Sequence, residues 1–281
     1  MEESRPSKVL TEHVRAVSKL TAFQGLSVED CSSIPTFRTF VRTSLLLPVQ
    51  LFFTESIVAL TSVMAATVYG VVYLFSECLT VVYVEQFGFG IGEASLIILA
   101  IGAGIPFTFL PRLYDLRMMR ACRQSGKTLQ PEDKLFGFYV AAPVLAIGLW
   151  WFACSVPPLV NISPWVSIVA LAFIGFSVVE FDSLLAGYLC DTYASYAASA
   201  NAPMSFLRCM MSGGFPLFGQ QMFRRLGSNI ALFLLASIAT LYCGVAVFFH
   251  FYGKRIRARS PFAEATWATT EASVKAKAER R

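Results

Sequence analysis

Six uninterrupted apolar runs constrain the fold of this chain more than any other feature. Crossing a hydrocarbon core of about 30 Å takes roughly 20 helical residues, and the runs are close to that length or longer. They do not alternate apolar and polar residues as the strands of a membrane barrel do, so they predict helices. The sequence therefore predicts an all-α membrane protein with six transmembrane helices, at residues 56–84, 91–110, 136–156, 165–189, 201–218 and 230–251.

The composition is typical of a chain whose surroundings are mainly lipid. Only 15% of the 281 residues are charged, whereas a soluble domain carries about 25% charged residues. The fifth run, 201–218, is the weakest because it is short and contains Pro203 and Pro216. We expect these prolines to kink the helix or to break it where it lines a cavity.

The positions of the basic residues predict the orientation of the chain. Of the 23 Lys and Arg, 20 lie before the first span, between spans two and three, or after span six. Only Arg224 and Arg225 lie on the opposite side, and Arg208 lies within span five. This positive-inside bias predicts that both termini are cytoplasmic. It also accounts for the net charge of +5 without a nucleic-acid partner.

Three regions follow from this topology. Residues 1–43 form a polar cytoplasmic segment without the apolar core of a signal peptide, residues 44–253 form the transmembrane domain, and residues 254–281 form a basic cytoplasmic tail. The basic start of the tail either rests on anionic lipid or simply flanks the last span.

The residue types that usually carry cofactor or enzyme chemistry are sparse. The seven Cys include no CxxC pair, and the two His lack any ligand spacing. Five of the Cys fall within or at the ends of spans, where they act as small apolar residues. We therefore expect no cofactor, no metal and no enzymatic activity. The sequon at Asn161 is a weak glycosylation candidate, because Pro164 follows it and the membrane is close.

Glu180, Asp182 and Arg208 are charged residues well inside the predicted spans, where burial is costly and usually functional. Glu180 and Asp182 lie about 10–14 Å above the inner end of span four, and Arg208 lies about 10 Å up span five, at roughly 1.5 Å per residue. The matched depths on consecutive helices predict an ion pair between Arg208 and one carboxylate.

The two carboxylates cannot share a helix face, because residues two apart differ by about 200°. We expect the carboxylate that lacks Arg208 to point at a cavity or at a missing partner. Two readings stay open for Glu180 and Asp182: a buried ion pair beside a solvated carboxylate, or direct contact with a substrate or proton.

Several long strings resemble the fungal drug:proton antiporters of the major facilitator superfamily. They are PVQLFFTESIV, YGVVYLFSECLTVVYVEQFGFGIGEASL, GYLCDTYASYAASANAPMSFLRCMMSGGFPLFGQQMFRRLG and FFHFYGKRIRARSPFA. The match is to the carboxy-terminal half of that family, spans seven to twelve, and covers roughly residues 40–262 of this chain. The family string is usually apolar or amide where Glu180 and Asp182 stand, so both depart from its pattern.

The resemblance implies a function as well as a fold. Members of the family have twelve spans and work by rocking two six-helix halves about a central site. It implies proton-coupled efflux of small organic molecules across the plasma membrane, by a half that needs a second copy or another six-span carrier half. The alternative is a truncated, non-transporting remnant or a regulatory membrane subunit.

The resemblance also suggests roles for individual residues. Glu77, in FSEC, matches the acidic position of the family's FEA-type string, where gating, cation contact or a solvated rim carboxylate are the alternatives. Asp191, in YLCDTY, matches the family's acidic turn and is expected to anchor a helix end. Four aromatic residues are candidates to line a cavity for an amphipathic substrate, with helix packing as the alternative role of each: Tyr69, Tyr73, Phe75 and Trp150.

Overall fold

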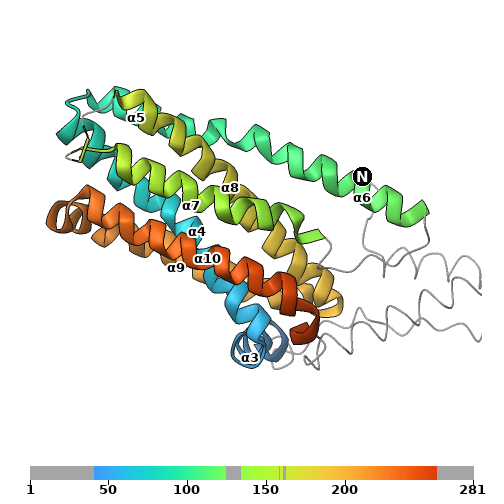
Figure 1. Cartoon of the computed structure of the whole chain (residues 1–281). Coiled ribbons are helices and arrows are strands. Elements are labelled where there is room, and N and C mark those ends of the chain that lie inside the picture. Colours follow the sequence, from blue (N-terminus) through green and yellow to red (C-terminus); the bar gives the residue numbers. More distant parts are fainter. Residues whose placement is uncertain (1–40, 125–133, 158, 161–162, 258–281) are drawn as a thin grey trace, which may run out of the picture. The chain divides into compact units, whose positions relative to one another are not determined.

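Helices account for every regular element in the residues that the computed structural model describes, which are 41–124, 134–157, 159–160 and 163–257. Residues from Leu47 onward form one unit, shown in Figure 1. Predictions for residues 1–40, for Asn161 and for residues 258–281 lie outside the described residues.

The elements follow one another with short connections. In chain order they are η1 Arg42–Leu46, α3 Leu47–Thr54, α4 Ser56–Leu79, η2 Thr80–Gln86, α5 Ile91–Ala103, η3 Ile105–Thr108, α6 Phe109–Gln124, α7 Phe136–Ser155, α8 Pro164–Thr192, η5 Ala194–Tyr196, α9 Ala197–Leu226 and α10 Ser228–Arg257.

Five of the six predicted spans coincide with helices that are long and apolar enough to cross a membrane: 56–86, 91–121, 136–155, 164–192 and 228–253. The sixth prediction, 201–218, falls inside α9, whose 30 residues suffice in length. Its Gly, Ser, Gln and Arg residues make α9 less apolar than the other five helices. The prediction of six spans is therefore not confirmed.

Of the two effects predicted for the prolines of α9, a break is wrong, because the helix continues without interruption through Pro203 and Pro216. A kink at these positions stays a prediction. A proline removes one backbone hydrogen bond, and neighbouring helices can compensate for that loss in a membrane protein. α7 likewise continues through Pro143.

The helical path of the second predicted span continues past residue 110. After α5, the chain forms the short 3-10 turn η3 and then α6, which extends to Gln124. Where this path leaves the membrane stays a prediction. Figure 1 shows α6 extending beyond the ends of the helices beside it.

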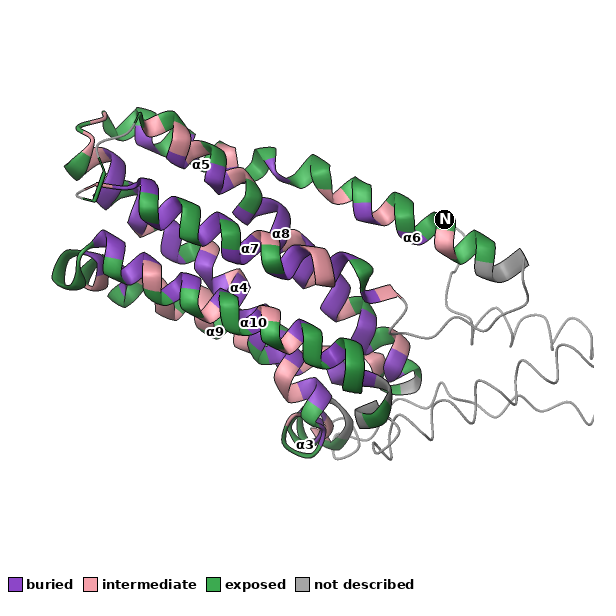
Figure 2. Ribbon diagram, in the orientation of Figure 1, coloured by how far each residue is buried: buried purple, intermediate pink, exposed green. Residues whose placement is uncertain are grey.

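The core of the bundle lies where α7, α8 and α10 meet. α7 packs against both other helices, and α4 packs along α9. The ring of Phe138 on α7 contacts Phe181 on α8 and Phe249 on α10, with centroids 5.1 and 6.4 Å apart. Figure 2 shows buried positions along the inner faces of these helices, so apolar packing holds the unit together.

α5 and α8 cross at two glycines with almost no space between their backbones. A Cβ on Gly104 would lie 2.0 Å from the carbonyl oxygen of Ala172, and a Cβ on Gly175 would lie 1.9 Å from that of Ile101. No side chain fits at either position. Because η3 begins directly after Gly104, this crossing fixes the point at which α5 ends and the path into α6 begins.

Candidate functional site

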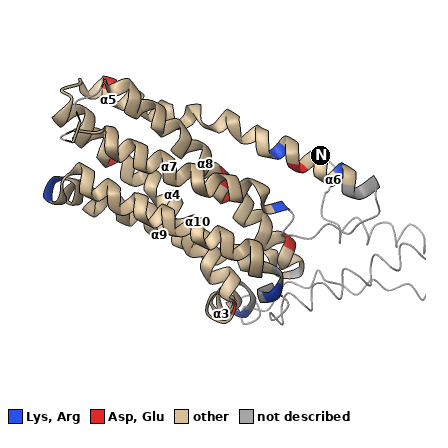
Figure 3. Ribbon diagram, viewed as in Figure 1, with Lys and Arg blue, Asp and Glu red and all other residues tan. Residues whose placement is uncertain are grey.

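An ion pair joins α8 to α9 at the centre of the site. Arg208 on α9 donates a hydrogen bond to the carboxylate of Asp182 on α8. The side chains are 24% and 33% exposed, respectively. The predicted pair is thus confirmed, with Asp182 as the partner of Arg208. Figure 3 marks acidic residues partway along α8, between ends where Lys and Arg gather.

Two tyrosines of α4 extend this pair into an aromatic surface. The guanidinium carbon of Arg208 lies 5.0 Å from the ring centroid of Tyr69, within cation–π distance. The ring of Tyr69 lies 5.5 Å from that of Tyr73, and Tyr73 is 39% exposed. Three helices therefore present a carboxylate, a guanidinium and two phenol rings together, which suits a small molecule with an aromatic part and a polar part. We call Tyr69, Tyr73, Asp182 and Arg208 the central site.

The structure corrects the expectation for Glu180. We expected the carboxylate without Arg208 to point at a cavity or a missing partner, yet the side chain of Glu180 is fully buried. It lies against α7, where a Cβ on Gly137 would be 2.9 Å from Oε2 of Glu180 and 3.3 Å from Pro111 of α6. Because Gly137 has no side chain, α7 leaves room for this carboxylate between helices.

One helical turn from Glu180, a polar pocket of about 430 Å³ lies between α6, the residues just before α7 and the last turns of α8. Its polar lining includes Arg112, Asp115, Lys134, Ser183 and Asp191. Arg112 donates a hydrogen bond to Ser183, and Lys134 bonds Asp191 at 2.7 Å. We call this space the inner polar pocket.

The Lys134–Asp191 ion pair connects the last turn of α8 to the residues just before α7. It supports the anchoring role of Asp191, which stays a prediction. Sequence reasoning used Arg112 and Lys134 only for topology and gave Asp115 no role. The signal for Asp115 was present, since it is a lone carboxylate among basic residues in PRLYDLRMMR.

Other candidates lie away from the central site. Glu77 is half-buried on α4 beside Gly219 of α9, and within the described parts of the chain no ion pair includes it.

Two aromatic candidates take part in helix packing. Phe75 is buried against Phe152, and Trp150 donates a hydrogen bond to Thr240 of α10 at 3.0 Å. The prediction that Phe75 lines a cavity is therefore wrong, because its ring faces the core. Trp150 is part of the α7–α10 contact rather than of the central site.

Polar contacts also link the ends of the bundle. At one end Arg224 bonds Glu85 at 2.6 Å, and Gln86 donates to Ser228 at 2.9 Å. At the other end Tyr193 donates to the buried Glu55 at 3.0 Å. These contacts fasten both ends of α4 to its neighbours.

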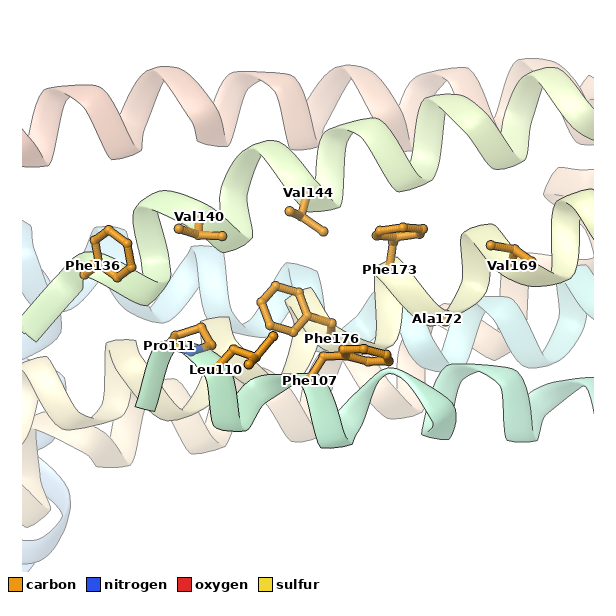
Figure 4. Close-up of a pocket in the computed structure, with 10 residues that line it drawn as sticks. All are labelled: Phe107, Leu110, Pro111, Phe136, Val140, Val144, Val169, Ala172, Phe173 and Phe176. Atoms are coloured by element: carbon orange, nitrogen blue, oxygen red, sulfur yellow. The ribbon is translucent and has the colours of Figure 1, made fainter. Parts of the chain in front are cut away.

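An apolar cavity of about 560 Å³ lies between α6, α7 and α8. Figure 4 shows Phe107, Phe136, Phe173 and Phe176 around it, with Pro111 at its edge. Its lining offers no polar side chain, so it is suited to apolar contact alone. Among the described residues, no group of three or more His, Cys, Asp or Glu could hold a metal ion.

Comparison with known proteins finds similar sequences but no similar solved structure. No protein-family model matches the chain, and no solved structure does. The chain is 33% identical over 265 residues to the MFS-type efflux pump MFS2 of Trichophyton rubrum, covering 93% of this chain and 44% of that protein. It is 30% identical over 258 residues to the efflux pump FUB11 of Gibberella moniliformis, covering 91% and 43%.

A third relative is the multidrug transporter TPO1_2 of Candida glabrata, 31% identical over 263 residues, which cover 93% of this chain and 45% of that protein. In each case the match extends over nearly all of this chain. The chain therefore spans about half the length of the curated relatives it matches.

Proposed function

This chain is homologous to one half of the fungal efflux pumps and multidrug transporters of the major facilitator superfamily, and we propose that it exports small organic molecules in exchange for protons. We propose further that it is the carboxy-terminal, six-span half, with α9 as the fifth span. The single observation that carries the proposal is the central site. It combines charge with aromatic surface on three helices that pack together partway along their length.

The central site supports an amphipathic substrate. An aromatic ring can stack beside Tyr69 and Tyr73, whose quadrupoles favour offset or edge contacts. A polar or charged group of the same molecule can then compete for Asp182 or Arg208. Because these two side chains are partly exposed, substrate binding exchanges one ion pair for another without first opening the core.

We propose that a second six-helix half completes the site. In a rocking-switch carrier the two halves are parallel repeats about an axis along the membrane normal. The exposed side chains of α9 include Phe206, Cys209 and Met210, next to Arg208 in sequence, so the surface beside the site is open for a partner. A second copy of this chain, or another carrier half, has the required parallel orientation.

We propose that both termini face the cytoplasm, with the transporter in the plasma membrane. Arg224 and Arg225 are the basic residues at the turn between α9 and α10, whereas Arg120, Lys134 and Arg255 lie near the opposite helix ends. The positive-inside rule supports an orientation with the end richer in basic residues inside the cell.

Efflux from proteoliposomes tests this proposal. The chain is reconstituted alone, as a tandem of two copies, and with the other six-span half of a relative, and export of a fluorescent amphipathic cation is followed under a proton gradient. We expect export only where a second half is present, and we expect Arg208→Ala to abolish it while Arg225→Gln retains it. Export by the monomer alone would contradict the need for a partner half. No export in any form would favour the non-transporting alternative.

A further inference from the structure

Glu180 is a buried carboxyl with no neighbour that satisfies it. Its side chain is fully buried, and neither Oε1 nor Oε2 has a hydrogen-bond partner in the described part of the chain. Asp182, two residues later, holds the ion pair with Arg208 instead. An uncompensated buried charge is strongly disfavoured. A carboxyl group in such a position therefore either binds a proton or lies close to a cation.

The surroundings of Glu180 come from three helices. On α6, Arg112 and Asp115 are the charged groups close enough to act on its charge. α7 contributes the bare backbone of Gly137, and α8 contributes Leu184 on the next turn. Lys134, before α7, acts on Asp115 and lines the inner polar pocket. A single positive group, Arg112, is therefore the nearest one able to compensate an ionised Glu180.

Arg112 is already engaged elsewhere. It donates a hydrogen bond to Ser183 on α8, one helical turn beyond Glu180. The Oδ1 atom of Asp115 is buried and also lacks a hydrogen-bond partner among the described residues. Lys134, which also acts on Asp115, is paired with Asp191. Three carboxyls thus share this interface with two positive groups, which is one positive charge too few if all three carboxyls are ionised. A proton supplies the missing charge.

A bound metal cation fits the site less well than a proton. A hard cation takes six or more oxygen ligands, whereas the described residues offer no cluster of three or more metal-ligating side chains. A proton needs only one carboxyl oxygen and a polar path to it. The inner polar pocket comes within one helical turn of Glu180, since Ser183 and Leu184 line it together with Arg112 and Asp115.

We propose that Glu180 is a proton-binding site of this transporter, loaded and unloaded through the inner polar pocket. The proton on the carboxyl leaves as a hydrated proton in the pocket, and the carboxylate that remains attracts the guanidinium of Arg112. Because Arg112 is on α6, the charge on Glu180 acts on the position of α6 relative to α8. This inference rests on the proposed transport function and names the group that couples it to protons.

Infrared difference spectroscopy tests the proposal without any substrate. The purified chain in lipid nanodiscs is titrated, and the carbonyl stretch of protonated carboxyl groups is recorded in H₂O and D₂O. We expect a band that disappears as the pH rises and shifts in D₂O, that is missing in Glu180→Gln, and that persists in Asp182→Asn and Asp115→Asn. An unchanged difference spectrum in Glu180→Gln would overturn the proposal. So would a Glu180 band that no pH removes.

A second measurement uses the wild-type chain and so does not depend on the folding of a variant. A hydrophobic carbodiimide modifies protonated carboxyls in apolar surroundings, and mass spectrometry of the digested wild-type chain locates the adduct. We expect modification at Glu180 that falls as the pH is raised, with Asp182 spared. Modification of Asp182 and not of Glu180 would overturn the assignment. If Glu180 titrates in a chain that exports nothing, the proton-binding site is supported and only the proposed export is contradicted.

Discussion

Arg208 joins Asp182 across the α8–α9 contact while its guanidinium carbon lies 5.0 Å from the ring centroid of Tyr69. One side chain thereby connects three helices, since Tyr69 is on α4. The arrangement gives the central site both its charge and its aromatic surface. It also makes Arg208 the residue whose removal reports most directly on the site.

Removal of Arg208 should destabilise the fold. Breaking a buried pair by removing one partner costs about 3–5 kcal/mol, and the partial exposure of both side chains places the expected loss below that range. Arg208→Ala should lower the midpoint of thermal unfolding in detergent, and Arg208→Ala with Asp182→Asn should recover part of the loss. Arg225→Ala is the control. An additive double variant would argue against coupling between the two residues.

The ring of Tyr69, rather than its hydroxyl, should support Arg208. A cation–π contact contributes about 0.5–2 kcal/mol, depending on exposure, and a phenylalanine ring keeps most of it. Tyr69→Phe should therefore unfold close to the wild type, and Tyr69→Leu should unfold at a lower temperature. Equal losses in both variants would show that the hydroxyl carries the interaction.

Gly175 should tolerate no side chain. A Cβ there would lie 1.9 Å from the carbonyl oxygen of Ile101, so Gly175→Ala must push α5 away from α8. Overpacking typically costs about 1–3 kcal/mol, and a backbone contact this close belongs at the upper end. Folded yield and unfolding temperature measure the loss.

Gly187 offers a matched control on the same helix. Nothing lies within 4 Å of a Cβ placed there, and alanine is favoured over glycine inside a helix by about 0.5–1 kcal/mol. Gly187→Ala should be neutral or slightly stabilising. A loss equal to that of Gly175→Ala would show that the crossing of α5 and α8 is not the cause.

The two ends of the bundle should face opposite sides of the membrane. Arg225→Cys, at the outer turn between α9 and α10, should react with an impermeant maleimide added outside intact cells. Arg117→Cys, on α6, should react only after the membrane is opened. Reversed labelling would contradict the proposed orientation.

The apolar runs, read from the sequence, determine the helical class and five of the candidate spans, and the positions of Lys and Arg determine which end of the bundle is more basic. The depth of Arg208 along its helix was enough to predict a partner at the matching depth on the preceding helix. These features follow from local pattern, because a run of apolar residues and the rise of a helix need no knowledge of neighbours.

Only tertiary packing decided which carboxylate pairs with Arg208 and where the other carboxylate points. Helical periodicity separates Glu180 from Asp182 but does not say which neighbour each face meets. Gly137 and Pro111 leave the space that buries Glu180, and they come from helices more than 40 residues away in the sequence. The direction of a side chain between helices depends on which backbones approach each other closely, and that is a property of the packed structure.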